Sequence, residues 1–354
     1  MSNYLTGAYV YDLSQSSRFS CSTAAMLTDG IGLVACLSGS LSGEYLNVLN
    51  LCAFSVNGTN ISIGPPTSVS GEFWFVNGYC GAMCSIDSSR MLLVTAASGI
   101  SGQGRIITVN PGTLAVSVGV PSGQVGGAPY SLFQQSANRF VGTTRNPVIW
   151  DVSGNTVSGS YLFPADPWYP YGMSSNEGAS GRIDDTHFWS MNVFGPDQWS
   201  IDVVSIAGSS GAVVQRLNRG GNSTFGILDA TNAVYANWDG AKYNVSPLSA
   251  RASDYAMSFG SVYSTHPGDV SVNFTPDKKA HLGRYGGSIT ASVVPQTYDA
   301  GDIVIGSPVT TYTWGDMRDK CGWGLAAFPN DTSRILQWMN DGSAVKLKIL
   351  KANS

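Results

Sequence analysis

Hydrophobic residues in this chain fall in short runs that are separated by polar turns. In the clearest example, Met91-Leu92-Leu93-Val94 follows the turn Asp87-Ser88-Ser89-Arg90, and further on Leu114-Ala115-Val116-Ser117-Val118 alternates between apolar and polar positions. Alternation with a period of two is typical of a half-buried strand, and a short apolar run bounded by turn residues is typical of a fully buried one. The pattern therefore predicts an all-β chain.

A polar turn followed by an apolar strand recurs along the whole sequence. The strands that follow these turns begin near residues 31, 90, 139, 187, 233, 279 and 334, in steps of 59, 49, 48, 46, 46 and 55 residues. Repeats of about this length that hold several strands are typical of propeller blades. We therefore predict seven four-stranded blades and expect the strand after each turn to be the inner strand of its blade.

The two ends of the sequence complement each other. The last unit is too short for four strands, whereas strand-like residues precede the first unit, so we expect residues near 5–22 to pair with residues near 334–350. The predicted fold class is an all-β, seven-bladed β-propeller, closed by pairing of the N-terminal strand into the last blade, in a single domain over 1–354. The predicted blade cores lie near 28–69, 85–124, 132–163, 182–218, 227–257, 272–311, and 325–354 plus 5–22.

Composition narrows the function classes. The chain has 42 glycines and 16 prolines, only 12% charged residues and a formal net charge of −4, without a basic stripe, which disfavours nucleic-acid binding. No apolar run reaches the length of a membrane helix, so membrane insertion is not expected, and the N-terminus lacks a secretory signal pattern. We therefore expect synthesis as a soluble chain in the cytoplasm.

Residues with catalytic or metal-binding chemistry are few. The six cysteines and three histidines lack zinc-ligand spacing, so we expect buried reduced thiols, no metal and no cofactor. His187 and His281 lie in predicted inner strands and are expected to be structural.

A glycosidase would need two facing carboxylates, for which the candidates are Asp184, Asp185, Asp197 and Asp202. However, aspartate recurs at one position of the repeat, where its side chain is expected to bond the backbone of its own turn. The aspartates of this set are Asp29, Asp87, Asp184, Asp229, Asp277 and Asp331.

Aromatic residues gather in three segments between the repeat strands, at 72–79, 161–171 and 312–319. Aromatic rings bury much area at low entropic cost and stack on sugars, so these segments are candidate binding loops. Contact with neighbouring subunits and ordinary packing between blades are the alternatives. The residues predicted to bind a ligand are Trp168, Tyr169, Tyr171, Trp74, Tyr79 and Trp314.

The second repeat resembles propeller-like repeats of bacteriophage tail and fibre proteins. The resemblance is carried by Ile86-Asp87-Ser88-Ser89-Arg90-Met91-Leu92-Leu93-Val94, followed by Arg105-Ile106-Ile107-Thr108-Val109 and Gly112-Thr113. It is clear in the first two repeats and weaker in the others. Two other propeller families fit poorly, because the Trp-Asp pairs are not at one place in each repeat and no sialidase-type aspartate box occurs.

The resemblance implies a protein of the virion, in a tail, fibre or spike, with other virion proteins as partners in an oligomeric assembly. Together with the aromatic segments it leads to the hypothesis of a non-enzymatic protein that attaches to a host-surface ligand, a glycan or a protein receptor. The alternatives are a purely structural subunit that decorates or connects parts of the particle and, third, a glycan-degrading enzyme. No nucleophile elbow, phosphate loop or dinucleotide fingerprint supports an enzyme.

Overall fold

The structure is a computed structural model, and every regular element in the part that it describes is a β-strand. The described residues are 4–12, 19–38, 45–74, 81–96, 101–127, 129, 131–143, 147–163, 180–195, 198–219, 223–227, 231–238, 243–264, 269–274, 279–286, 290–299, 302–305, 309–313, 323–331, 333–340 and 344–352. None of these residues forms a helix that could cross a membrane.

The chain forms two compact units. The first unit holds residues 1–129, 150–159 and 316–354, and the second holds residues 130–149 and 160–315. Each unit is built from antiparallel sheets whose strands follow one another along the chain. Local hairpins therefore account for almost all of the strand pairing, as expected for a repeat of small blades.

Three sheets lie entirely within the first unit. One has the order β2-β3-β4-β5, with β6 also paired to β4, and a second has the order β7-β8-β9-β10, with β11 also paired to β9; the third is β30-β31-β32-β1. Their strands are β1 (Tyr4–Asp12), β2 (Phe19–Thr28), β3 (Ile31–Ser38), β4 (Tyr45–Asn57), β5 (Asn60–Ile63), β6 (Thr67–Trp74), β7 (Ala82–Ser85), β8 (Arg90–Ala96), β9 (Ser101–Val109), β10 (Val116–Val118), β11 (Val125–Gly127), β30 (Trp323–Ala327), β31 (Arg334–Asn340) and β32 (Ala344–Ala352).

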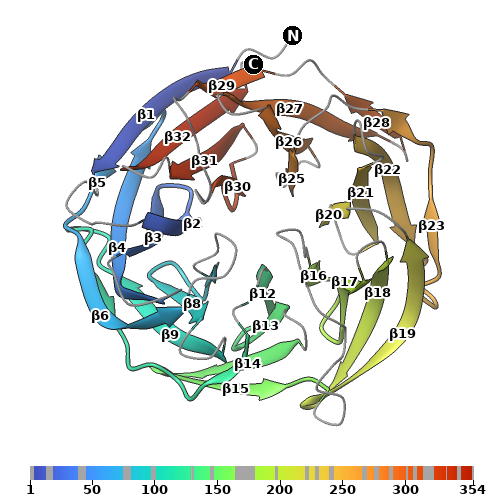
Figure 1. The fold of residues 1–354 in the computed structure, drawn as a ribbon, viewed down its shortest axis with the longest axis horizontal. Helices are drawn as coiled ribbons and strands as arrows, with labels where there is room; N and C mark the ends of the chain where they lie inside the picture. The colour runs from blue at the N-terminus through green and yellow to red at the C-terminus, as the bar shows by residue number, and fades with distance from the viewer. Residues whose placement is uncertain are drawn as a thin grey trace. The chain divides into compact units, whose positions relative to one another are not determined.

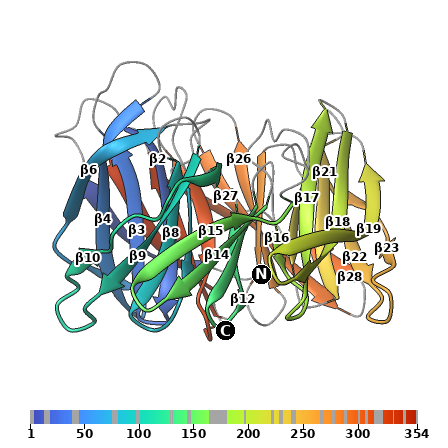
Figure 2. The ribbon, with the colours of Figure 1, turned by 90° about the horizontal axis from the view of Figure 1, so that it is seen from below.

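Three further sheets lie entirely within the second unit, in the orders β16-β17-β18-β19, β20-β21-β22-β23 and β25-β26-β27-β28, where β24 also pairs with β22 and β29 with β27. Figure 2 shows β17, β18 and β19 side by side. The strands are β16 (Ser180–Arg182), β17 (His187–Gly195), β18 (Gln198–Ala207), β19 (Ser210–Arg219), β20 (Ser223–Ile227), β21 (Asn232–Trp238), β22 (Tyr243–Ala250), β23 (Met257–Phe259), β24 (Tyr263–Ser264), β25 (Asp269–Phe274), β26 (Lys279–Gly286), β27 (Thr290–Asp299), β28 (Asp302–Ile305) and β29 (Val309–Thr313).

The remaining sheet has the order β12-β13-β14-β15 and is divided between the units. Its strands β12 (Ser131–Ser136) and β13 (Arg139–Thr143) belong to the second unit, whereas most of β14 (Val148–Ser153) and β15 (Thr156–Tyr161) belongs to the first. The reason is local packing, because the Trp150 ring and Val157 fill the space over Gly104 of β9. The prediction of seven equivalent blades is therefore wrong. Six blades each lie wholly within one of the two units, and the strands of the remaining sheet are divided between the units.

The pairing of the chain ends agrees with the prediction in part. β1 pairs with β32 in antiparallel register from Tyr4 opposite Ala352 to Asp12 opposite Ala344, and Figure 1 shows these two strands alongside each other near the chain ends. The predicted N-terminal segment also included residues 19–22, and here the prediction is wrong. Those residues belong to β2, which pairs with β3 in the first blade.

The position of the repeat strand within its sheet also needs correction. The strand after each turn was expected to be the first of its blade, yet β3, β8, β17, β21, β26 and β31 are each the second strand in their sheets. His187 in β17 and His281 in β26 are therefore in second strands. Some of the first strands are very short, as in Ser180–Arg182, so they give little signal in the sequence.

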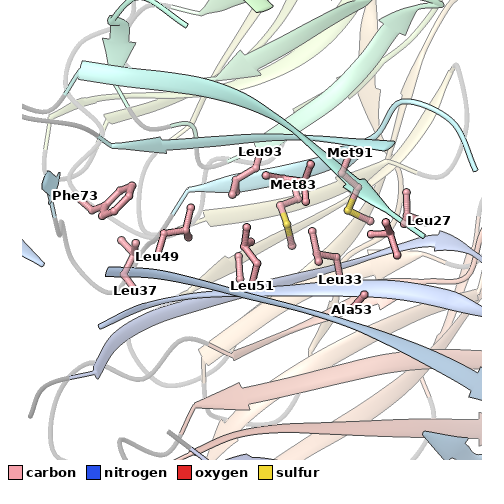
Figure 3. Close-up of a cluster of buried hydrophobic side chains, with 13 residues drawn as sticks. Leu27, Leu33, Leu37, Leu49, Leu51, Ala53, Phe73, Met83, Met91 and Leu93 are labelled. Atoms are coloured by element: carbon pink, nitrogen blue, oxygen red, sulfur yellow. The ribbon is translucent and has the colours of Figure 1, made fainter. Parts of the chain in front are cut away.

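The blades are buried on both faces, and this explains why their middle strands read as continuous apolar runs. In β3, Leu33, Ala35 and Leu37 face the sheet of β8 and β9, whereas Val34 and Cys36 face the sheet of β31 and β32. Figure 3 shows the first of these two clusters, in which Leu33 and Leu51 lie opposite Met83 and Met91. Side chains from neighbouring blades therefore make the hydrophobic core.

Candidate functional site

Arginines at the start of several second strands connect one blade to the next. Each donates from Nη1 to the carbonyl oxygen of a glycine in a hairpin turn of the following sheet, and those glycines have φ between 60° and 64°. The pairs are Arg90 with Gly154 at 2.8 Å, Arg139 with Gly208 at 2.6 Å and Arg334 with Gly58 at 2.8 Å. Within the described residues this contact recurs at equivalent places of the repeat, which indicates a structural role.

At the equivalent place in the blade of β17, a histidine and a tyrosine replace this contact. His187 Nδ1 lies 3.0 Å from Asp184 Oδ1 and 3.0 Å from the Tyr255 hydroxyl, which donates to Asp184 Oδ2 at 2.7 Å. The His187 and Tyr255 rings lie 4.2 Å apart. Thr186 completes the cluster by donating its N–H and its hydroxyl to Asp184 Oδ1. Asp184, Thr186, His187 and Tyr255 are called the His187 cluster below.

The chemistry of the His187 cluster is that of a tightly held carboxylate. Partial burial acts to raise the pKa of Asp184, but the hydrogen bonds from the Thr186 N–H, Tyr255, His187 and the Thr186 hydroxyl outweigh it and hold this pKa well below its usual range. The bond to Asp184 in turn raises the pKa of the Tyr255 hydroxyl. Because the histidine, threonine and tyrosine all converge on one carboxylate, the cluster fits an inter-blade contact better than acid–base catalysis.

Three of the four aspartates proposed for a carboxylate pair are described, and each is engaged separately. Asp185 pairs with Arg182 at an exposed turn, and Asp202, which is fully buried, accepts from Arg216 at 2.9 Å and 2.6 Å. Asp197 lies outside the described residues. Asp185 and Asp202 each pair with a different arginine, so the described part of the chain offers no support for a glycosidase pair.

The expected turn role of the repeated aspartates is confirmed at three positions and wrong at one. Asp87, Asp184 and Asp331 each accept from the backbone N–H two residues on. Asp29 instead accepts from the N–H of Asn330 in the neighbouring blade, while Thr28 Oγ1 accepts from the N–H groups of its own turn. Asp229 and Asp277 lie outside the described residues.

The structure describes little of the predicted ligand-binding set. Trp168, Tyr169, Tyr171, Tyr79 and Trp314 lie outside the described residues. Trp74 ends β6, where its backbone is opposite Tyr45 in β4. These residues therefore remain predictions, and the described structure brings no two of them together.

A residue that the sequence analysis did not single out lies beside the first aromatic segment. Arg105 in β9 is 7% exposed, and its guanidinium carbon lies 5.4 Å from the centre of the Phe73 ring, next to Trp74 in β6. Arg105 Nη1 donates to Thr95 Oγ1 at 3.2 Å and Nη2 donates to Gln103 Oε1 at 2.7 Å. Burial lowers the pKa of Arg105. The signal was present in the sequence as an arginine directly before Ile106-Ile107 in an otherwise apolar strand.

The Arg105 surroundings are anchored by a second layer of hydrogen bonds. Gln103 Nε2 donates to the carbonyl oxygen of Ser122 at 3.1 Å, and Ser122 Oγ accepts from the N–H of Gly104 at 2.9 Å. Thr95 is opposite Gln103 in the β8–β9 pairing, near the end of this hairpin. Arg105, Thr95, Gln103 and Phe73 are called the Arg105 site below, and they form the candidate functional site.

The side chains of three cysteines are described. Cys36, Cys52 and Cys84 form no disulfide, and burial raises the pKa of Cys52 to about 11. In the described part of the chain, no group of three or more histidine, cysteine, aspartate or glutamate residues could hold a metal ion.

Comparison with known proteins defines the fold class. No family model and no curated protein matches the chain. Among solved structures, the chain is similar over its whole length to the β-propeller domain of Cps50 (Swd1) from Myceliophteria thermophila, with a TM-score of 0.60, 8% identity and 100% of both chains covered. It is also similar to a putative 6-phosphogluconolactonase from Bacteroides fragilis, with a TM-score of 0.56, 11% identity and coverage of 85% of this chain and 91% of that one.

A third solved structure, the periplasmic gluconolactonase PpgL of Pseudomonas aeruginosa, matches with a TM-score of 0.54 and 10% identity, covering 91% of this chain and 100% of that chain. At such identities the likeness concerns the fold alone. This chain has an all-β propeller fold, and the predicted class is confirmed at that level.

Proposed function

We propose that this chain is a non-enzymatic β-propeller of a bacteriophage virion, a tail, fibre or spike component that attaches to a host-surface ligand, with a glycan as the expected class. The proposal rests on the observation that the described polar clusters are occupied by structural hydrogen bonds. The Asp87, Asp184 and Asp331 turns and the His187 cluster are engaged in local and inter-blade contacts. The aromatic segments then remain the best candidates for binding.

Two further observations support the proposal. The second repeat resembles repeats of phage tail and fibre proteins, and the aromatic segment at 72–79 starts beside the buried Arg105. Buried polar groups next to aromatic rings are the usual components of a ligand site on a rigid scaffold. The likeness to a putative 6-phosphogluconolactonase and to a gluconolactonase lends no activity to this chain, because it is a likeness of fold alone.

A binding experiment tests this proposal directly. The purified chain, fluorescently labelled, is expected to bind host cells and to select particular glycans on an array. Replacing Trp168, Tyr169 and Tyr171 together by alanine should weaken that binding, whereas alanine at the exposed Val120 should not. A chain that binds no host surface and no glycan, yet is firmly built into the particle, would contradict an attachment role.

A second candidate function, a structural subunit of the particle, is favoured by a different observation. Val120 and Val262 are 80% and 66% exposed, and each follows a short outer strand, β10 or β23. Exposed apolar residues at the outer edges of blades suit packing against neighbouring subunits. Locating the chain in an intact particle distinguishes the two, because this candidate requires those valines to be buried in subunit contacts.

A further inference from the structure

The outer strand of a blade presents a row of backbone N–H and C=O groups along its free edge. Such an edge is a template for pairing with another chain, and proteins normally protect it with short strands, prolines, bulges or charged residues. In four of the described sheets the outer edge is divided, because two separate strands pair with the same neighbour, which is β4, β9, β22 or β27. Pro65 and Pro66 lie in one of these interruptions and Pro121 in another.

Two further outer strands are undivided, and each is limited in another way. β15 has only six residues. β19 has ten residues, but it carries Arg216 and Arg219, and its register with β18 shifts so that Val214 is opposite no residue. Bulges and charged residues both hinder the addition of a further strand.

The outer strand of the last blade, β1, has none of these protections. It is nine residues long, it contains no proline, and its only charged residue is Asp12 at its end. Its register with β32 runs without a shift from Tyr4 to Asp12. Within the described residues β1 pairs with β32 alone, and Figure 1 shows it along the outside of that strand. Since only alternate residues of an antiparallel strand bond to one neighbour, β1 has a regular second edge that can accept another strand.

The composition of β1 indicates which partner fits this edge. Residues 4–11 carry no charge, so an acidic or basic peptide would find no opposite charge along β1, whereas a second β1 strand would meet no like charge. In an antiparallel pair of β1 strands centred on Ala8, the two Asp12 residues would lie about 27 Å apart, which is well beyond the screening length of physiological salt.

The lysines of the neighbouring strand do not oppose such a pair. Lys346 and Lys348 belong to β32, so two intervening β1 strands would separate them from the same lysines of the other copy by about 14 Å. We propose that the outer edge of β1 binds β1 of a second copy of this chain in antiparallel orientation, which joins two four-stranded sheets into one. A pair of identical surfaces related by a two-fold axis closes at two copies, so a dimer results rather than a fibre.

Sedimentation equilibrium of the full chain tests this proposal. The wild type is expected to approach twice the 37.3 kDa mass of one chain as its concentration rises. Ala8→Pro and Tyr9→Pro are made as separate variants, because one of two consecutive residues directs its N–H to β32 and the other directs it to the free edge. The proline at the free edge should raise the dissociation constant of the dimer at least about tenfold and leave the unfolding temperature of the monomer unchanged.

A proline on the other long outer strand is the matched control. Val214→Pro alters β19 at its bulge, where proline is tolerated, and should leave the dimer intact. A wild type that remains a monomer at every concentration would overturn the proposal. A dimer that survives both β1 prolines would overturn it too, because the copies would then meet at another surface. Neither result bears on attachment to a host ligand.

Amide hydrogen exchange in the wild type decides the case in which both β1 prolines lower the unfolding temperature. Peptides that cover β1 should exchange more slowly at high protein concentration than at low concentration, because the second copy protects the N–H groups of the free edge. Peptides that cover β19 should exchange at the same rate at both concentrations. Exchange in β1 that is independent of concentration would show that its edge has no partner strand and would overturn the proposal.

Discussion

Single side chains show how one position of the repeat is adapted to different neighbours. At the first residue after the turn, Arg90, Arg139 and Arg334 donate to a glycine carbonyl of the next sheet. At the same position His187 meets Tyr255, whose φ of 59° lies in the left-handed region that non-glycine residues rarely adopt. The ring contact with His187 and the bond to Asp184 hold Tyr255 in this conformation.

The His187 cluster gives a prediction at the residue scale. Tyr255→Phe removes the hydroxyl that donates to Asp184 and should lower the free energy of unfolding by about 1–2 kcal/mol, the usual cost of a lost hydrogen bond to a charged group. Urea denaturation measures this change. Tyr161→Phe is the matched control, because Tyr161 is 44% exposed, and an equal loss there would show that the cluster adds no stability.

The lowered pKa of Asp184 predicts how the stability of the fold depends on pH. Its pKa is lowered in the folded state, so the stability that it contributes is fully present above its unfolded pKa, about 4, and declines as the pH falls toward its folded pKa. The wild type should therefore be more stable than Asp184→Asn by a constant amount above about pH 5, with the difference shrinking at lower pH. A difference that is constant down to pH 2 would contradict this account of Asp184.

Two glycines test backbone geometry at single positions. Gly81 has a φ of 111°, and a Cβ there would lie 1.9 Å from the carbonyl oxygen of Val94, whereas Gly58 has a φ of 63° and open space around its Cβ position. Gly58→Ala should therefore cost about 1 kcal/mol from backbone strain alone. Gly81→Ala should cost clearly more, because β7 and β8 must move apart. Thermal unfolding of both variants checks the order, and equal losses would contradict it.

At the scale of elements, the sequence was most informative where a strand follows a polar turn. The strands β8, β13 and β31 begin at Arg90, Arg139 and Arg334, as the repeat predicted. Their place as second strands could not be predicted, because the strand that precedes them in a blade can be as short as Ser180–Arg182 and then gives little signal in the sequence. The Arg105 site was missed for a related reason: which blade faces a given residue is decided by strand order.

The outer edges of three blades share a pattern that can be recognised only with the structure. The outer strands β5, β10 and β23 each end in apolar-x-apolar-Gly, after which the chain turns and a second strand, β6, β11 or β24, pairs with the same neighbour. Gly64, Gly119 and Gly260 donate their N–H groups to a residue of that neighbouring strand at 2.8 Å each. The glycine lets the backbone turn close to its neighbour, since a Cβ at Gly119 would lie 3.0 Å from the carbonyl oxygen of Ile106.

The inter-blade arginines give a prediction at the element scale. Arg334 is 11% exposed and contacts Asp331, Gly58 and the Phe328 ring, whereas Arg90 is 29% exposed. Arg334→Ala should therefore lower stability by about 2 kcal/mol, and Arg90→Ala by less, because an exposed contact is screened by solvent. Arg182→Ala, which removes only an exposed pair with Asp185, should have the smallest effect on the urea midpoint. The reverse order would contradict the structural role assigned to these contacts.

At the scale of the whole molecule, packing between blades protects the interior of each sheet. Cys36 and Cys52 are buried in the cluster that joins the first blade to the sheet of β31 and β32, and burial raises the pKa of Cys52 to about 11. At pH 8 its thiolate is therefore scarce and inaccessible. Alkylation followed by peptide mass spectrometry should label Cys52 only when the protein unfolds, and rapid labelling of the native protein would contradict the observed packing.

The most direct test of the propeller account concerns the pairing of the chain ends. Ala8 in β1 is opposite Lys348 in β32, a separation within the range that a disulfide can bridge, whereas a partner two residues away is too distant. Mild oxidation of Ala8→Cys/Lys348→Cys should yield a disulfide between these two positions, identified by peptide mass spectrometry, and the shifted pair Ala8→Cys/Lys346→Cys should not. Absence of the first disulfide, or equal formation of both, would contradict a last blade that is completed by the N-terminal strand.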